Sequence, residues 1–290
     1  MTRHPIRPRR SVLYMPGSNA RAQEKAKMLP VDGLILDLED ATAPDAKEAA
    51  RELVCKNARE GGYGSREVII RVNGADTPWG AADLAAASAA RPHAVLLPKV
   101  ERPETVALAA RALDEAGAHD TVLWCMMETP LGVLRVESIA SASPRVACLV
   151  MGTSDLSKDL HALHTRERLP MLTSLGLCLL AARAHHLSIL DGVHLDLDDE
   201  AGFRAACQQG LELGFDGKTL IHPKQVAACN EVFSPAPAAI EHARRVMAAF
   251  QAAREGGAGV AVLDGKLVES LHAAEAERLV ALADALAAAG

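Results

Sequence analysis

The chain has 290 residues, of which 49% are hydrophobic and 3% aromatic, and its formal net charge is −6. This length suits one α/β barrel of about 250 residues plus an extension. The acidic balance and the scarcity of aromatic rings argue against a nucleic-acid-binding protein, because phosphates are repelled by negative charge and bases stack on aromatic side chains.

The cysteines and the N-terminal sequence favour a soluble cytoplasmic protein. The six cysteines are scattered without a C-x-x-C pair, and most lie among aliphatic residues, as buried thiols do. The basic segment 1–10 leads into one short apolar stretch, which lacks the length of a secretory signal. The uncharged run 169–182 is too short to cross a bilayer and contains Pro170 and Gly176.

Short apolar runs recur along the chain and predict a barrel of parallel strands. Their near-continuous apolarity suits strands that are buried on both faces, and most gaps between them are long enough for a helix. Helix start signals precede 46–59, 105–116 and 201–213. We therefore expect a (β/α)₈ TIM barrel over residues 1–233, with strands at Ser11–Met15, Gly33–Leu38, Val68–Val72, Ala94–Leu97, Val122–Met127, Val146–Met151, Leu187–Leu195 and Lys218–Ile221.

A boundary follows the last strand. The Pro-containing segment 234–237 separates the barrel from a predicted helix at 238–254, a Gly-rich turn and a final Ala/Leu helix. The apolar positions of that last helix need a packing surface. Residues 234–290 are therefore predicted to form a C-terminal helical extension that serves as a lid and an oligomerisation segment.

Polar residues gather at or just after the ends of the predicted strands. In a parallel barrel these ends meet at one mouth, where such enzymes place their chemistry. The alternative for each acidic residue is that it caps the next helix. The set comprises Glu39, Asp40, Arg71, Asn73, Lys99, Glu128, Asp155, His194, Asp196 and His222.

Glu128 and Asp155 each follow a buried strand, and two such carboxylates suit a hard cation. Mg²⁺ commonly takes one or two protein carboxylates, whereas Zn²⁺ would require closely spaced His or Cys. Position alone leaves two roles open for Arg71: contact with a ligand carboxylate or enolate oxygen, or an internal salt bridge to Glu39 or Asp40. For Lys99 an ion pair is favoured over a Schiff base, and for both histidines we favour loop hydrogen bonds over acid-base chemistry.

These residues lie in motifs that resemble the citrate lyase β-subunit-like family, relatives of malyl-CoA and citramalyl-CoA lyases in the HpcH/HpaI aldolase class. The resemblance spans about residues 10–270 and rests on the segments 10–17 (RSVLYMPG), 36–40 (LDLED), 71–73 (RVN), 97–99 (LPK), 128–129 (ET), 152–156 (GTSDL), 214–218 (GFDGK) and 221–223 (IHP).

The resemblance implies a TIM barrel in which Glu128 and Asp155 hold Mg²⁺ and Glu39 and Asp40 support metal-bound water. It implies that Arg71 touches a CoA thioester bound at the mouth, and we add Asn73 and Lys99 as substrate-binding candidates. It also implies a homo-oligomer, a trimer, whose C-terminal segment covers an active site. Several acyl-CoA lyases carry an Asp in a late G-x-M-I-D motif, where this chain has Glu269, our candidate acid.

The expected reaction is retro-Claisen cleavage of a short 3-hydroxyacyl-CoA of the citramalyl-CoA or malyl-CoA type, giving a 2-keto acid and an acyl-CoA. Two alternatives keep the metal site: the β subunit of a citryl-acyl-carrier lyase, and a metal-dependent aldolase that releases pyruvate without a thioester. A catalytically silent assembly protein would leave the Glu128, Asp155 and Arg71 set unexplained.

Overall fold

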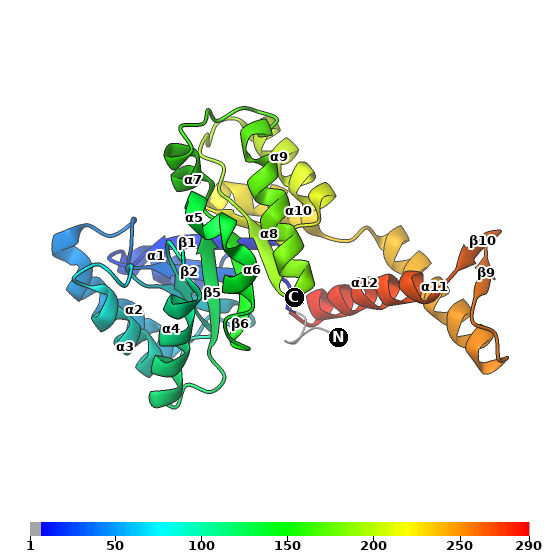
Figure 1. The fold of residues 1–290 in the computed structure, drawn as a ribbon, viewed down its shortest axis with the longest axis horizontal. Helices are drawn as coiled ribbons and strands as arrows, with labels where there is room; N and C mark the ends of the chain where they lie inside the picture. Colours follow the sequence, from blue (N-terminus) through cyan, green and yellow to red (C-terminus); the bar gives the residue numbers. More distant parts are fainter. Residues whose placement is uncertain (1–6, 290) are drawn as a thin grey trace. The chain divides into compact units, whose positions relative to one another are not determined.

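The computed structural model describes residues 7–289, which form two compact units. Residues 9–233 form the first unit. Residues 234–289 form the second unit together with residues 7 and 8. Figure 1 labels the α-helices and several strands of the two units.

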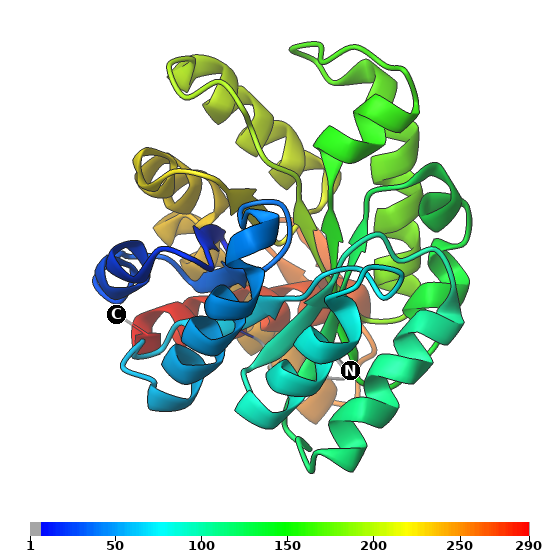
Figure 2. The same ribbon diagram turned by 90° about the vertical axis from the view of Figure 1, so that its left-hand side faces the viewer.

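The first unit is a closed barrel of eight parallel strands in chain order, β1 to β8. Figure 2 shows helices arranged around these strands. The (β/α)₈ barrel predicted from the sequence is therefore confirmed. The strands are Ser11–Pro16, Gly33–Asp37, Glu67–Arg71, Ala94–Leu97, Val122–Met127, Val146–Met151, Ser188–Asp191 and Gly217–Leu220. The α-helices are α1 Ala20–Ala26, α2 Lys47–Glu60, α3 Gly80–Ala90, α4 Pro103–Glu115, α5 Pro130–Leu134, α6 Val136–Ala140, α7 Thr153–Asp159, α8 Leu172–Ala184, α9 Glu200–Leu213 and α10 Val226–Phe233, and the 3₁₀ turns are η1 Pro44–Ala46, η2 Leu169–Met171 and η3 Pro223–Gln225.

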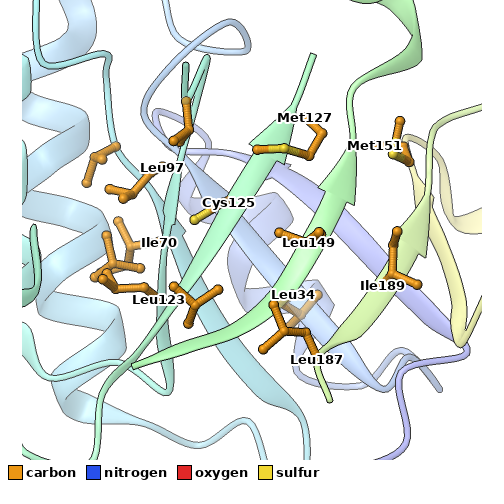
Figure 3. Close-up of a cluster of buried hydrophobic side chains, with 14 of the residues drawn as sticks. Leu34, Ile70, Leu97, Leu123, Cys125, Met127, Leu149, Met151, Leu187 and Ile189 are labelled. Atoms are coloured by element: carbon orange, nitrogen blue, oxygen red, sulfur yellow. The ribbon is translucent and has the colours of Figure 1, made fainter. Parts of the chain in front are cut away.

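Side chains of β1 to β7 alternate between two buried clusters. The larger cluster, part of which is shown in Figure 3, includes Leu34, Ile70, Leu149 and Ile189 and packs against the surrounding helices. The smaller cluster takes the alternate positions of the same strands and fills the barrel interior, with members Val12, Ile35, Ile69, Leu96, Trp124, Val150 and Leu190. Burial on both faces explains the continuous apolarity of the strands.

This alternation decides which polar side chains enter the barrel. Asp37 and Arg71 are each two residues beyond an interior residue, Ile35 and Ile69, and therefore point inward. They are also register partners at the ends of β2 and β3. The sheet thus brings an aspartate and an arginine side by side at the carboxyl end of the barrel.

The seventh strand is shorter than the prediction of 187–195. It ends at Asp191, and residues 192–199 form a connection in which Leu195 is exposed. The apolar residues beyond Gly192 therefore belong to a loop. The uncharged run 169–182 forms η2 and most of α8. Between residues 7 and 289, no helix is both long and apolar enough to cross a membrane.

The second unit consists of α11 (Pro237–Glu255), a hairpin of β9 (Ala261–Leu263) and β10 (Lys266–Val268), and α12 (Ser270–Ala289). Its two helices are coloured orange and red in Figure 1. Leu279 and Val280 of α12 pack on a small buried cluster that includes Val246 of α11. The packing surface of the last helix is thus provided within its own chain. The hairpin was not predicted, although Asp264 and Gly265, both at positive φ, are a common signal for such a turn.

A buried ion cluster joins β7, β8 and the segment before α8. The Asp191 carboxylate lies 2.7 Å from both Lys218 Nζ and Arg168 Nη1, and Asp191 and Lys218 are at most 1% exposed. Burial alone would raise the pKa of Asp191, but Lys218 and Arg168 outweigh it and hold that pKa below its usual value. Asp191 is therefore ionised at neutral pH.

Asp191→Asn should destabilise the barrel by about 3–5 kcal/mol, because it leaves the buried Lys218 and the partly buried Arg168 without their shared counter-ion. Urea denaturation at pH 7 measures this change. Asp284→Asn is the matched control, since its partner Arg244 and Asp284 itself are more than half exposed, and it should change stability by less than about 1 kcal/mol. Equal effects of the two substitutions would mean that the buried cluster contributes no more than a surface pair.

Candidate active site

Five of the predicted residues lie next to one another at the carboxyl end of the barrel. Glu39 follows β2, Arg71 ends β3, Lys99 follows β4, Glu128 follows β5, and Asp155 lies in the first turn of α7 after β6. Ion pairs join Glu39 to Arg71 and Lys99, and Lys99 to Asp155. The Lys99 amide donates a hydrogen bond to Glu128 Oε1 at 2.7 Å.

The Arg71 guanidinium is held on several sides. Its Nε and Nη2 donate to the two carboxylate oxygens of Asp37, each at 2.6 Å. Its Nη1 lies 2.6 Å from Glu39 Oε2 and 3.5 Å from Asp40 Oδ2. The guanidinium also lies over the Tyr14 ring, 4.9 Å from its centre. The internal salt bridge weighed from the sequence is present, and the bidentate partner that fixes the plane of the guanidinium is Asp37.

Sequence reasoning missed Asp37 and Tyr14 as site residues. Asp37 and Glu39 are two residues apart in the motif at 36–40, and this period-2 spacing was a signal that both face the same side of a strand. Tyr14 gave a weaker signal, because it lies in an apolar strand and is half-buried. Burial raises the pKa of the Tyr14 hydroxyl above its ordinary range. The phenol therefore remains protonated at neutral pH.

Glu128 is a buried carboxylate, only 2% exposed. Burial, followed by the negative charge of Glu39, raises the pKa of Glu128 to about 7. Gly152, directly after β6, leaves room for this side chain: a Cβ at position 152 would lie 2.4 Å from Glu128 Cβ and 2.5 Å from Glu128 Oε2. The position of the carboxylate thus depends on a glycine in the neighbouring strand connection.

Gly152→Ala should therefore displace Glu128 and lower the free energy of unfolding by about 1–3 kcal/mol, as overpacking a filled interior does. Urea denaturation measures this loss. Gly176→Ala is the control, because no heavy atom lies within 4 Å of a Cβ at that position of α8, and alanine in a helix interior should add about 0.5–1 kcal/mol. A Gly152→Ala protein as stable as the wild type would show that the contact is relieved without cost.

Lys99 forms the ion pair favoured from its sequence. Its Nζ lies 2.6 Å from Glu39 Oε1 and 3.0 Å from Asp155 Oδ2. Burial alone would lower the pKa of Lys99, but the hydrogen bond to Glu39 and the charge of Glu128 raise that pKa above its ordinary value. The amine is therefore protonated at neutral pH and unsuited to form a Schiff base, which requires a neutral nitrogen.

Asn73 lies in a different environment, between α2 and α3. Its Oδ1 accepts a hydrogen bond from Lys47 Nζ at 2.7 Å, and its Nδ2 donates to Leu38 O and to Asp83 Oδ2. The side chain is buried and its polar atoms are used by these protein groups. Asn73 therefore orders the connection after β3, and we do not propose direct contact with substrate.

The remaining polar residues of the predicted set lie in loops. His222 Nδ1 accepts a hydrogen bond from the Lys224 amide and caps η3, which is the loop role favoured from the sequence. Asp196 Oδ1 accepts from the amides of Asp198 and Asp199. The His194 ring meets Phe203 edge-on, and burial lowers the pKa of this histidine.

Glu269 belongs to the second unit, directly after β10. It is exposed, and its backbone amide donates a hydrogen bond to His272 Nδ1. The barrel residues described above belong to the first unit.

The donor set of the barrel site fits a hard divalent cation. Five carboxylates, those of Asp37, Glu39, Asp40, Glu128 and Asp155, are joined there by two basic side chains, Arg71 and Lys99. Oxygen ligands and excess negative charge are what Mg²⁺ requires. Within residues 7–289, no group of three or more His, Cys, Asp or Glu side chains is arranged so that all of them could bind one metal ion. Glu39 and Asp155 instead contact the Lys99 ammonium, and Glu128 accepts a hydrogen bond from the Lys99 backbone amide.

Comparison with known proteins identifies the family of the chain. Residues 10–223 match the family model described as HpcH/HpaI aldolase/citrate lyase. The (3S)-malyl-CoA thioesterase of Cereibacter sphaeroides is 52% identical over 98% of both chains. Citrate lyase subunit beta of Escherichia coli is 35% identical over 91% of this chain and 89% of its own. A crystal structure of CitE from Mycobacterium tuberculosis in complex with magnesium, acetoacetate and coenzyme A has a TM-score of 0.73 and 27% identity, covering 97% of this chain and 99% of that one.

The family match covers most of the barrel and confirms the resemblance seen in the motifs. The matched range includes the five neighbouring site residues, which are Glu39, Arg71, Lys99, Glu128 and Asp155. Aldolases and citrate lyases both cleave carbon-carbon bonds. The chain therefore belongs to the HpcH/HpaI aldolase/citrate lyase family.

Proposed function

We propose that the protein is a Mg²⁺-dependent lyase that cleaves a short 3-hydroxyacyl-CoA of the malyl-CoA or citramalyl-CoA type into a 2-keto acid and an acyl-CoA. The observation that carries the proposal is the fixed guanidinium of Arg71 beside a group of carboxylates at the barrel mouth. The chain is 52% identical to a malyl-CoA enzyme over 98% of both chains, but only 35% identical to citrate lyase subunit beta of Escherichia coli. This difference supports malyl-type thioesters over citryl thioesters as the substrate class. The magnesium and coenzyme A in the CitE structure support the metal and the carrier.

In this proposal Glu128 and Asp155 hold the metal. When bound, Mg²⁺ supplies positive charge that orients the substrate carboxylate and hydroxyl and favours the alkoxide. One of the two carboxylates Glu39 and Asp40 accepts the single hydroxyl proton, directly or through a water that both support. The bond between C2 and C3 then breaks, and its electron pair passes into the thioester enolate.

Arg71 stabilises the enolate oxygen through Nη1, the guanidinium nitrogen on the side of the exposed Asp40, while Asp37 keeps the guanidinium in place. A donor positioned in advance for developing negative charge is a large source of catalysis. Protonation of C2 completes the acyl-CoA, and Glu269 is our candidate for this acid.

Hydrolysis of the same thioester is the second candidate, and the relative named (3S)-malyl-CoA thioesterase is the observation that favours it. Water would attack the thioester carbonyl instead of the C2–C3 bond breaking, with free CoA and the hydroxy acid as products. Both reactions use a site that binds Mg²⁺ and stabilises negative charge on the thioester oxygen.

A panel of 3-hydroxyacyl-CoAs tests the proposed substrate class. Each compound is incubated with the protein and Mg²⁺, and the products are identified by mass spectrometry. Turnover of malyl-CoA or citramalyl-CoA to a 2-keto acid supports the lyase, and turnover to free CoA supports the hydrolase. No turnover of any member would refute the substrate class.

We further propose that the C-terminal unit closes an active site of a neighbouring copy in a homotrimer, and that the protein works in the cytoplasm. The six cysteines are buried free thiols, which suits a reducing compartment. Excluding water protects an enolate from side reactions. A segment that closes over the site and carries an acid would both exclude water and protonate the enolate.

Glu269→Gln should lower kcat about 100-fold or more while leaving CoA affinity within about threefold, because an amide cannot donate the proton. Steady-state kinetics and CoA titration measure the two quantities. Mixing Arg71→Ala with Glu269→Gln protein then tests the shared site, since exchange of subunits should restore part of the activity. Full activity of Glu269→Gln would remove its chemical role, and no recovery after verified exchange would place both residues in one chain's site.

A further inference from the structure

Lys99 contacts carboxylates that follow three different strands. Its Nζ reaches Glu39 after β2 and Asp155 after β6, while its backbone amide donates to Glu128 after β5. The residue adopts a left-handed backbone conformation with φ of +46°, which is uncommon for any residue other than glycine. Such a conformation persists only where the surroundings enforce it, and here it lets one residue serve both the ammonium and the amide contacts.

The ammonium thus stands among the carboxylates that a metal would use. Glu39, Glu128 and Asp155 repel one another when ionised, and a positive charge between them is needed to hold them close. The Lys99 ammonium supplies one unit of that charge at 2.6 and 3.0 Å. A divalent cation bound to Glu128 and Asp155 would supply two, and it would repel an ammonium that remained in the same place.

The exposed fractions of Lys99 and of the carboxylates around it indicate which side chain has room to move. The Lys99 side chain is 44% exposed, whereas that of Glu39 is 10% exposed and Glu128 is 2% exposed. A lysine carries its charge on a flexible four-carbon stem. Asp155, at 29%, is also less exposed than Lys99. The ammonium is therefore able to swing toward solvent while the buried carboxylates of Glu39 and Glu128 and the Lys99 amide stay where they are.

We propose that Lys99 is a built-in counter-cation: its ammonium holds Glu39 and Asp155 together without metal and leaves them when Mg²⁺ binds. Its backbone amide keeps Glu128 in place in both states. The inference rests on the proposed function, because it takes Glu128 and Asp155 as the ligands. Once displaced, the ammonium is free for the substrate contact predicted from the sequence.

Calorimetric titration of Mg²⁺ into metal-stripped protein tests this competition. Lys99→Met should bind Mg²⁺ about tenfold tighter or more, because the metal no longer displaces a charge. The metal-free Lys99→Met protein should melt at a lower temperature than the wild type, and saturating Mg²⁺ should raise its Tm by more than it raises that of the wild type. Lys99→Arg keeps the charge and should not tighten binding.

Two further variants make the outcome decisive. Lys56→Met removes the same charge from an exposed surface pair on α2 and should bind Mg²⁺ like the wild type. Lys99→Gln, which is also neutral, replaces Lys99→Met if that protein does not fold. Unchanged or weaker Mg²⁺ binding by the neutral Lys99 variant would overturn the counter-cation role.

Failure of the underlying metal site has a separate signature. If wild-type protein binds Mg²⁺ and Glu128→Gln does not, the site stands and only the affinity of the neutral Lys99 variant decides the inference. If the wild type does not bind Mg²⁺, or Glu128→Gln binds it equally well, both the metal site and the role of Lys99 are overturned.

Discussion

Glu128→Gln and Asp155→Asn should each weaken Mg²⁺ binding more than about 100-fold and abolish most turnover, while the barrel remains folded. Mutation of a residue that only orients a metal ligand typically lowers metal affinity 10–100-fold. Removal of the charge of a ligand itself should therefore lower the affinity further. The fold should tolerate Glu128→Gln because burial already raises the pKa of Glu128 to about 7, which makes a neutral side chain acceptable there. Calorimetry, steady-state kinetics and circular dichroism measure the three quantities.

Asp120→Asn is the matched control. Asp120 is exposed and precedes β5 at the opposite end of the strand from Glu128, so the same loss of charge occurs far from the mouth. Its Mg²⁺ affinity and turnover should match those of the wild type. Unchanged affinity in both Glu128→Gln and Asp155→Asn would discard this pair as the metal ligands.

Arg71→Lys should lower kcat by roughly 10²–10³, the effect of removing a positioned donor for developing negative charge. Lysine retains the charge but lacks the planar fork, so it cannot bind both oxygens of Asp37 and still face Glu39. The circular dichroism spectrum should barely change. Single-turnover kinetics with a substrate identified from the panel measure the loss at the chemical step.

Arg9 offers a close structural match at the other end of the barrel. It binds both carboxylate oxygens of Glu67, at 2.7 and 2.9 Å, and lies 4.9 Å from the centre of the Trp124 ring, much as Arg71 lies against Asp37 and Tyr14. Arg9→Lys should therefore lose stability without losing kcat. Equal losses of kcat in the two variants would assign Arg71 a structural role, and wild-type kcat in Arg71→Lys would remove it from the chemistry.

The barrel was predictable from the sequence because its strands are buried on both faces and leave continuous apolar runs. The same signal failed at the seventh strand, where Val193 and Leu195 continue the run although the sheet ends at Asp191. Apolar character does not distinguish a strand from the loop that continues it. The hairpin of β9 and β10 was missed because each strand has only three residues, too few for a periodic pattern.

The position of the site was predictable from the sequence, but the ion pairs between its side chains were not. Strand ends bring Glu39, Arg71, Lys99, Glu128 and Asp155 to one mouth, and the structure joins them there. The bidentate Asp37 required the register between β2 and β3, which sequence patterns do not contain.

Asn73 and Lys99 show a second reason why pairing escapes the sequence. Alternation along β3 stops at Arg71, so Asn73, two residues later, turns toward Lys47 and Asp83 instead of the mouth. The reach of Lys99 to both Glu39 and Asp155 depends on its left-handed backbone, which no propensity predicts for lysine.

The bond that is broken tests the central claim most directly. The protein is incubated with (3S)-malyl-CoA and Mg²⁺ in water enriched in ¹⁸O, and products are sampled from the first turnover by mass spectrometry. A retro-Claisen lyase produces glyoxylate and acetyl-CoA in equal amounts, with the thioester intact and no early release of free CoA. Release of free CoA together with malate carrying ¹⁸O in its new carboxylate, and no glyoxylate, would contradict carbon-carbon cleavage and assign thioester hydrolysis to this site.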